Sequence, residues 1–212
     1  MSDPLSTLTQ AELLALALEA SRRGDSGHAL VYLKEAARRS DASARALFML
    51  GSEYAQLGLA SEAKASMSRA VEQADAFPLA HFQLGMLHVV SGENAAARAA
   101  WAALDGLASG HAESYLLAFR RGMQHLMADE FDAAVQALRE GVAANRANEP
   151  LNADMRRVID AIEHLPGRQA TQETAGAALP PSPLPEPLSA ALDDVDAGHL
   201  FISAYTQRGK PH

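Results

Sequence analysis

Apolar residues recur every three or four positions through most of the first 165 residues, and short polar segments separate these stretches. This spacing places the apolar side chains on one face of an α-helix. Leu14, Ala17 and Leu18, for example, share a face of a helix that is predicted from about residue 10 to residue 23 and that ends at Gly24. The pattern therefore predicts a series of amphipathic helices joined by short turns.

Small and large residues also recur along the chain with a longer period. Glycine or alanine at a fixed position allows two helices to approach closely, and a large residue at another fixed position fills the space beside them. Each period is therefore expected to form one pair of packed helices. Three pairs of residues, each 34 positions apart, define the period: Gly51 and Gly85, Ala63 and Ala97, and Met67 and Trp101.

This pattern resembles the tetratricopeptide repeat, a helix-turn-helix unit of 34 residues. The resemblance implies an all-α fold: an α-α superhelix of about four repeats, with a capping helix and a tethered C-terminal helix. The fourth repeat departs from the period, because Gly122 follows Gly85 by 37 residues and Arg121 replaces an expected leucine. The repeats are expected at about residues 10–43, 44–77, 78–111 and 115–148, and the capping helix at 149–165, so that the repeat domain spans 1–165.

The composition changes after residue 165. Residues 166–187 include the run ALPPSPLPEP, which predicts an extended linker without a core of its own. Residues 188–212 return to an amphipathic pattern. We expect this segment to bind another protein, or to dock on the repeats of its own chain or of a second copy. Its candidate binding residues are Leu192, Val195, Leu200, Phe201, Ile202 and Tyr205.

Composition and charge exclude several classes of protein. Hydrophobic residues make up 48% of the chain and aromatic residues only 5%, which favours closely packed helices over a β-sandwich. The formal net charge of −8 disfavours nucleic-acid binding, which needs a basic surface. The chain has no cysteine and no apolar stretch long enough to span a membrane. We expect a cytoplasmic protein without membrane insertion, and the excess of arginine over lysine indicates a bacterial source.

The sequence contains no motif that predicts catalysis. It lacks the phosphate-binding loop, the nucleophile elbow and the HExxH zinc motif. His81, His88 and His125 occupy positions that pack helices together in the resembled family, and no carboxylate stands at ligand spacing beside them. The run DDVDAG at 193–198 lacks the glutamate that closes a calcium loop. We therefore expect no enzyme activity, no catalytic residue, no metal site and no cofactor.

The resemblance also implies a concave groove, lined mainly by the first helix of each repeat. Phenylalanine and flexible methionine at these positions suit an apolar helix or an extended segment of a partner. An alternative is that these side chains are buried between repeats, or covered by the chain's own tail. The candidate groove residues are Leu14, Leu18, Phe48, Met49, Ser52, Phe82, Met86, Val89, Val90, Phe119, Met123, Leu126 and Met127.

The function that follows from this reading is a non-catalytic protein–protein interaction module, either an adaptor or an assembly factor. Two alternatives stay open: a secretion-system chaperone for a hydrophobic client, and a regulatory subunit of an enzyme complex. The groove positions lack the lysine and asparagine residues with which some family members bind the C-terminal carboxylate of chaperones. A co-chaperone of that kind is therefore not expected.

Overall fold

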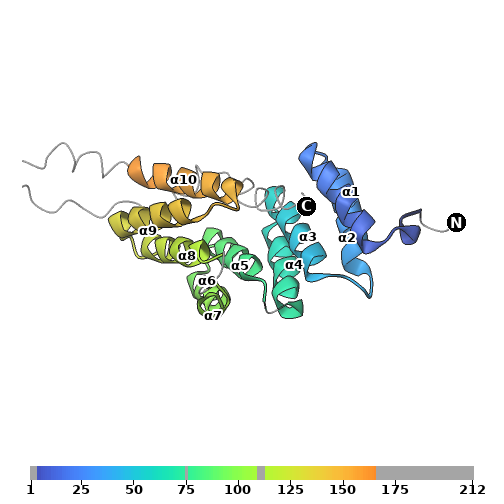
Figure 1. Cartoon of the computed structure of the whole chain (residues 1–212), viewed down its shortest axis with the longest axis horizontal. Helices are drawn as coiled ribbons and strands as arrows, with labels where there is room; N and C mark the ends of the chain where they lie inside the picture. Colours follow the sequence, from blue (N-terminus) through green and yellow to red (C-terminus); the bar gives the residue numbers. More distant parts are fainter. Residues whose placement is uncertain (1–3, 75, 109–112, 166–212) are drawn as a thin grey trace, which may run out of the picture.

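The computed structural model describes residues 4–74, 76–108 and 113–165 of the 212-residue chain, and all the regular secondary structure in these residues is helical. The all-α fold predicted from the sequence is therefore confirmed. Successive helices form an array that runs along the long axis of the molecule, with α1 and α2 at one end and α9 and α10 at the other (Figure 1). The predicted linker and the C-terminal segment, residues 166–212, lie outside the described residues.

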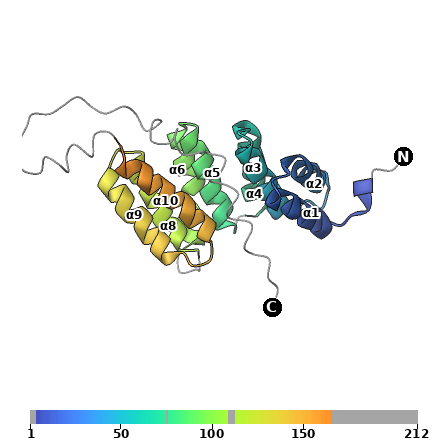
Figure 2. The ribbon, with the colours of Figure 1, turned by 90° about the horizontal axis from the view of Figure 1, so that it is seen from above.

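Most helices are joined in antiparallel pairs, and each pair packs on the next pair along the chain. The pairs are α1 with α2, α3 with α4, α5 with α6, and α8 with α9. The second helix of each of the first two pairs also packs against the first helix of the following pair, and α9 packs against α10 in the same way. The view from above shows this succession as two groups of side-by-side helices (Figure 2). The helices are η1 (Pro4–Thr7), α1 (Gln10–Arg22), α2 (Ser26–Arg38), α3 (Ala44–Gln56), α4 (Ala60–Gln73), α5 (Pro78–Val90), α6 (Asn94–Trp101), α7 (Leu104–Leu107), α8 (Tyr115–Leu126), α9 (Phe131–Ala144) and α10 (Glu149–Glu163).

Side-chain caps fix the start of several helices. Thr9 forms a capping box with Glu12, in which each side chain accepts a hydrogen bond from the backbone N–H of the other residue. The side chains of Ser43 and Asn148 cap α3 and α10. Each accepts a single hydrogen bond from the backbone N–H of the residue three positions later. These residues satisfy N–H groups that have no partner inside the helix.

The turn inside each helix pair has one conformation, repeated four times. Its central residue has a positive φ, near +72° at Gly24, Gly58 and Gly92, and +57° at Asp129. This is the Schellman motif, in which two backbone N–H groups after the helix bond to carbonyls of its last turn. The outer of these bonds measures 2.8–2.9 Å and joins Asp25 to Ala20, Leu59 to Tyr54, Glu93 to His88, and Glu130 to His125.

The two helices of a pair meet at a small residue of the first helix. A Cβ atom added to Gly51 would lie 2.6 Å from Cγ of Met67, and one added to Gly122 would lie 2.7 Å from Cγ of Leu138. A Cβ on Gly85 would overlap the indole ring of Trp101. The prediction that these glycines allow close helix contact is confirmed, and it holds for the fourth pair despite its 37-residue interval.

The joint between α9 and α10 is a buried network of asparagines. The Asn145 amide donates to the Asn148 carbonyl and to Oδ1 of Asn152, both at 2.9 Å. The Asn152 amide donates back to the carbonyl of Asn145, also at 2.9 Å. Because each buried amide has partners, the network holds α10 against α9 without the cost of an unpaired polar group.

Candidate partner-binding surface

The phenylalanines of the predicted groove lie inside the array and have no exposed surface. Phe48, Phe82 and Phe119 are all fully buried. The ring of Phe82 lies 6.2 Å from the ring of Phe119 and 6.2 Å from Trp101, while Phe48 lies 5.0 Å from Phe77. These rings join neighbouring helices and successive pairs, so they do not form an open lining.

Six further residues of the predicted groove are buried with them. The hydroxyl of Ser52 donates a 3.0 Å bond to the carbonyl of Phe48 in its own helix, so it has an internal partner. Helical spacing places residues on one face of a helix, but it does not show whether another element covers that face. The open Phe- and Met-lined groove expected from the sequence is therefore corrected to a buried contact layer at these six: Met49, Ser52, Met86, Val89, Met123 and Leu126.

Four residues of the predicted groove keep part of their surface exposed. Leu14 and Leu18 lie on the first helix, α1, whose pair has a neighbouring pair on one side only among the described helices. Val90 is the last residue of α5, and Met127 directly follows α8. The accessible part of the predicted set therefore lies at the N-terminal end of the array and at two helix ends.

The large apolar side chains that are most exposed were missed by the sequence reasoning. They are Leu16 at 40%, Val31 at 50%, Leu57 at 44% and Leu59 at 39%, and all belong to the first two helix pairs. We call these four residues the N-terminal apolar set. One signal was present in the sequence: Leu59 stands at a turn position that is acidic in the other pairs, where Asp25, Glu93 and Glu130 occur.

The acidic residues at that turn position form local ion pairs. Oε1 of Glu93 lies 2.6 Å from Nζ of Lys64, and its other oxygen contacts Nδ1 of His88. The hydrogen bonds from Lys64 and His88 hold the pKa of Glu93 below its usual value, because they stabilise the carboxylate. His125 contacts Glu130 in the same way. His88 and His125 therefore each contact a glutamate in the turn of their own pair, whereas the sequence reasoning expected packing between helices and no neighbouring carboxylate.

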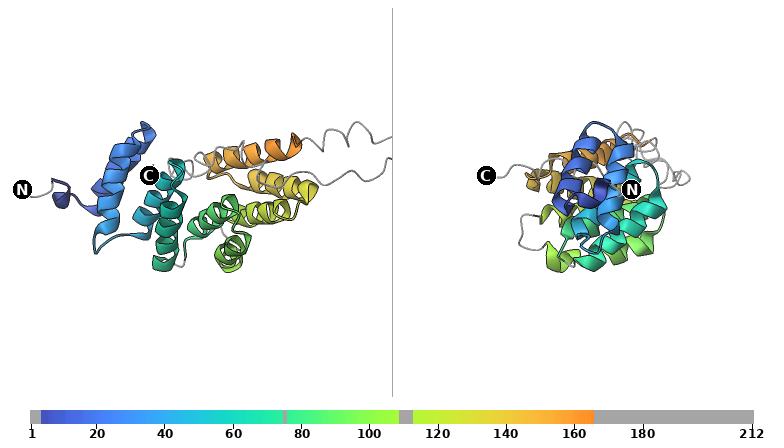
Figure 3. Two further views of the ribbon diagram at one scale, coloured as in Figure 1. Left: turned by 180° about the vertical axis from the view of Figure 1, so that it is seen from behind. Right: turned by 90° about the vertical axis from the view of Figure 1, so that its right-hand side faces the viewer.

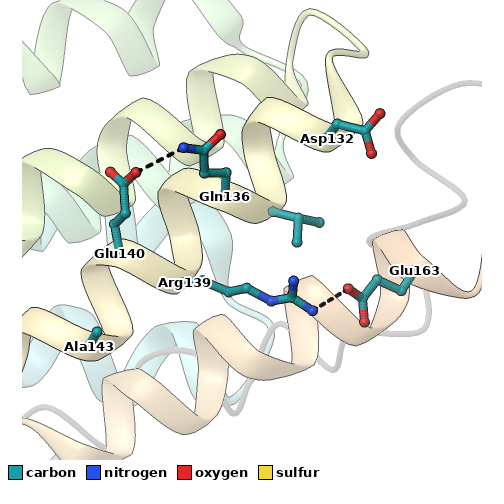
Figure 4. Close-up of a pocket in the computed structure, with 7 residues that line it drawn as sticks. Asp132, Gln136, Arg139, Glu140, Ala143 and Glu163 are labelled. Carbon is teal, nitrogen blue, oxygen red and sulfur yellow. Dashed lines mark hydrogen bonds and ion pairs between the residues drawn. The ribbon is translucent and has the colours of Figure 1, made fainter.

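A shallow cleft lies between α9 and α10 (Figure 4), at the end of the array opposite α1 (Figure 1). Its volume is about 670 Å³, and Val135 and Ala143 form part of its floor. Arg139 of α9 reaches across to Glu163 of α10 at 2.7 Å, while Gln136 bonds to Glu140 along α9. Arg139 and Glu163 are paired with each other, and Glu140 pairs with Arg121 of α8. The residues that line the cleft form no arrangement of nucleophile and base.

One buried acid is unusual. The side chain of Asp154 on α10 has no exposed surface; Nη1 of Arg157 lies 2.7 Å from its Oδ1, whereas Oδ2 has no hydrogen-bond partner. Burial raises the pKa of Asp154 to about 7, and the charge of Arg157 opposes that rise only in part.

Comparison with known proteins does not assign the chain. No protein-family model matches it, and no curated protein matches it. Within residues 4–74, 76–108 and 113–165, no three histidine, aspartate or glutamate side chains are grouped so that they would hold a metal ion. None of the helices in those same ranges is long and apolar enough to cross a bilayer.

Proposed function

We propose that this protein is a tetratricopeptide-like interaction module that binds an apolar segment of a partner protein. The observation that carries this proposal is the repeated architecture: four helix pairs share one turn conformation, and three of them share one type of close contact at a glycine. An array of this kind has a long, continuous surface, which suits binding an extended or helical segment of another protein.

The N-terminal apolar set is the proposed place of binding. Single exposed apolar residues are ordinary on protein surfaces, but within the described part of the chain all four exposed large ones lie on α1–α4 or in the turn between α3 and α4. Leu14 and Leu18 of the predicted groove, both partly exposed, lie on α1 as well. A partner helix with one apolar face, or an extended apolar segment, that contacts Leu57 and Leu59 in the turn between α3 and α4 would remove their exposed surface from water.

The repeat itself supplies a test variant that preserves the fold. Replacing Leu59 by glutamate introduces the residue that the third and fourth pairs have at this position. Leu57→Ser changes a neighbouring exposed residue. Peptides selected from a displayed library on the wild-type chain should bind this double variant at least tenfold more weakly. The melting temperature should be unchanged, because neither side chain is buried.

A matched control lies at the other end of the array. Gln136→Ser with Ala143→Ser changes two exposed residues of the α9–α10 cleft and should leave peptide affinity unchanged. The proposal is contradicted if the library yields no binding peptide. It is equally contradicted if the selected peptides bind the Leu57/Leu59 variant and the control variant with the same affinity.

A further inference from the structure

The last described helix, α10, buries two different sides. One side faces α9: Asn152 bonds to Asn145 there, and Ile159 lines a cleft together with Val142. Leu151, Val158 and Ile162 lie about a quarter of a turn farther around the helix, and all three are at most 1% exposed. Among the described helices, α10 packs mainly against α9, which lies on its other side.

Comparison with α8 shows what the second side corresponds to. The burial pattern of α10 repeats that of α8 after 36 residues, so that Val158 takes the place of Gly122. On α8, the side that contains Gly122 faces the following helix, α9, through Leu138. The second side of α10 is thus the side on which a following helix packs in the other pairs. The equivalent residues are Tyr115 and Leu151, Phe119 and Met155, Gly122 and Val158, and Leu126 and Ile162.

The second helices of the four pairs share a sequence template. The template begins with the residue that precedes the helix, which is acidic in three of the four pairs. Four positions later comes an alanine, and eight positions later a large apolar residue. The residue eleven positions later is small in three of the four pairs. The template allows the helix to lie close to its partner and to fill the space beside the small residue. It reads Asp25, Ala29, Leu33 and Ala36 in the first pair; Leu59, Ala63, Met67 and Ala70 in the second; Glu93, Ala97, Trp101 and Leu104 in the third; and Glu130, Ala134, Leu138 and Gly141 in the fourth.

The same template occurs once more with an acidic cap, beyond the described residues. Asp193 is followed by Ala197, Phe201 and Ala204 at the intervals of the four pairs. The same spacing also occurs at Ala191, Val195 and Gly198. The residue at their cap position is Pro187, whose side chain cannot cap a helix.

We propose that residues 193–206 form a helix that packs on the second side of α10, in the place of the second helix of a fifth pair, with Phe201 near Val158. Because valine stands here where three of the described pairs have glycine, these two helices would lie farther apart. In the other pairs a turn of a few residues joins the two helices, whereas here residues 166–192 would join them. An extended linker of this length spans up to roughly 80 Å at ~3.1 Å per residue, far more than the return to α10 requires. This proposal is independent of the proposed partner and its binding surface.

Asp154 supports this placement. It is equivalent to His81 in the third pair, whose Nδ1 lies 3.2 Å from the carbonyl oxygen of Ala100 in the second helix. Burial raises the pKa of Asp154 to about 7 and leaves its Oδ2 without a partner. A protonated carboxyl group at this place can donate to a carbonyl, and the equivalent of Ala100 in the proposed helix is Leu200.

Two adjacent residues of the full-length chain test the register. Phe201 should point toward α10, whereas Ile202 is equivalent to three exposed residues and one half-buried one: Lys34, Ala102 and Arg139, and Ser68. We expect Phe201→Asp to accelerate amide hydrogen exchange in α10 at least tenfold, with exchange in α1–α4 unchanged. Ile202→Asp, the matched control, should change exchange in α10 less than twofold.

Equal effects of the two substitutions, or no effect of Phe201→Asp, would overturn the proposal. Introduced cysteines provide a second measurement, because the natural chain contains none. The Val158→Cys, Phe201→Cys chain should oxidise to a monomeric disulfide at least tenfold faster than the Val158→Cys, Ile202→Cys chain. Equal rates, or a disulfide that joins two copies, would show that the segment does not pack on its own α10.

Discussion

The second and third helix pairs use the same positions for contact but fill them differently. In the second pair, the flexible side chain of Met67 lies against Gly51, and the second helix, α4, continues for 14 residues. In the third pair, the indole of Trp101 lies against Gly85, and the second helix, α6, ends after 8 residues at Trp101 itself. The short helix α7 then follows, and α6 and α7 lie together beside α5 (Figure 3).

The difference shows which features of a pair are fixed and which can vary. The indole N–H of Trp101 donates a 3.0 Å bond to the Phe82 carbonyl, which locks this side chain in place in a way that methionine cannot. After Trp101 the helix tightens, because the N–H of Ala102 bonds to the carbonyl of Ala99, three residues back. The small-to-large contact is therefore the constant part of the pair, whereas the length of the second helix adapts.

The largest expected effect comes from removing the indole. Trp101→Ala deletes a fully buried side chain and the hydrogen bond to the Phe82 carbonyl. It should lower the free energy of unfolding by about 3–5 kcal/mol. Arg98→Ala, on the exposed face of the same helix, should change it by less than about 0.5 kcal/mol in the same urea titration. A loss at Trp101 no larger than at Arg98 would mean that the indole does not hold this pair together.

A smaller effect is expected from filling the small position. Gly85→Ala places a methyl group against the rigid indole and should cost about 1–3 kcal/mol through overpacking. At Gly92 the added methyl group would contact no neighbouring atom. The alanine would have to adopt a φ of +72°, which costs about 1–2 kcal/mol.

A second substitution separates the two mechanisms. Shortening Trp101 to methionine should reduce the cost of Gly85→Ala but leave the cost of Gly92→Ala unchanged, as measured by thermal unfolding. If both costs respond equally to Trp101→Met, the close contact is not what selects glycine at position 85.

The smallest effect concerns the turn of the fourth pair. Asp129 has a φ of +57° where the other pairs have glycine. Asp129→Gly should therefore stabilise the chain, by about 0.5 kcal/mol. Asp132→Gly, in the first turn of α9, is the matched control and should destabilise by roughly 0.5–1 kcal/mol, because glycine has a lower helix propensity and the favourable negative charge at the helix start is lost. A loss of stability at both positions would show that the strain at Asp129 is compensated locally.

The contacts inside each pair were predictable from sequence, and the accessible surface was not. The intervals between Gly51 and Gly85 and between Met67 and Trp101 report directly on helix contact, because only small residues allow it. Phe48 and Leu16 are both apolar residues at helical spacing, yet one is fully buried and the other is 40% exposed. Burial depends on which neighbouring pair covers a face, and periodicity within one helix does not contain that information. The interruption after Trp101 was equally hidden, since Ala102 and Ala103 both favour a helix.

A double-mutant cycle at Gly122 and Leu138 tests the central claim that every pair is built on one contact. This fourth pair is the strictest case, because its interval is 37 residues and its added Cβ would lie 2.7 Å from Leu138. Gly122→Ala by itself should lower the free energy of unfolding, and Leu138→Ala by itself should lower it by about 2–5 kcal/mol. Together they should cost at least about 1 kcal/mol less than their sum, because the smaller side chain makes room for the added methyl group. Costs that add to within about 0.3 kcal/mol would contradict the claim.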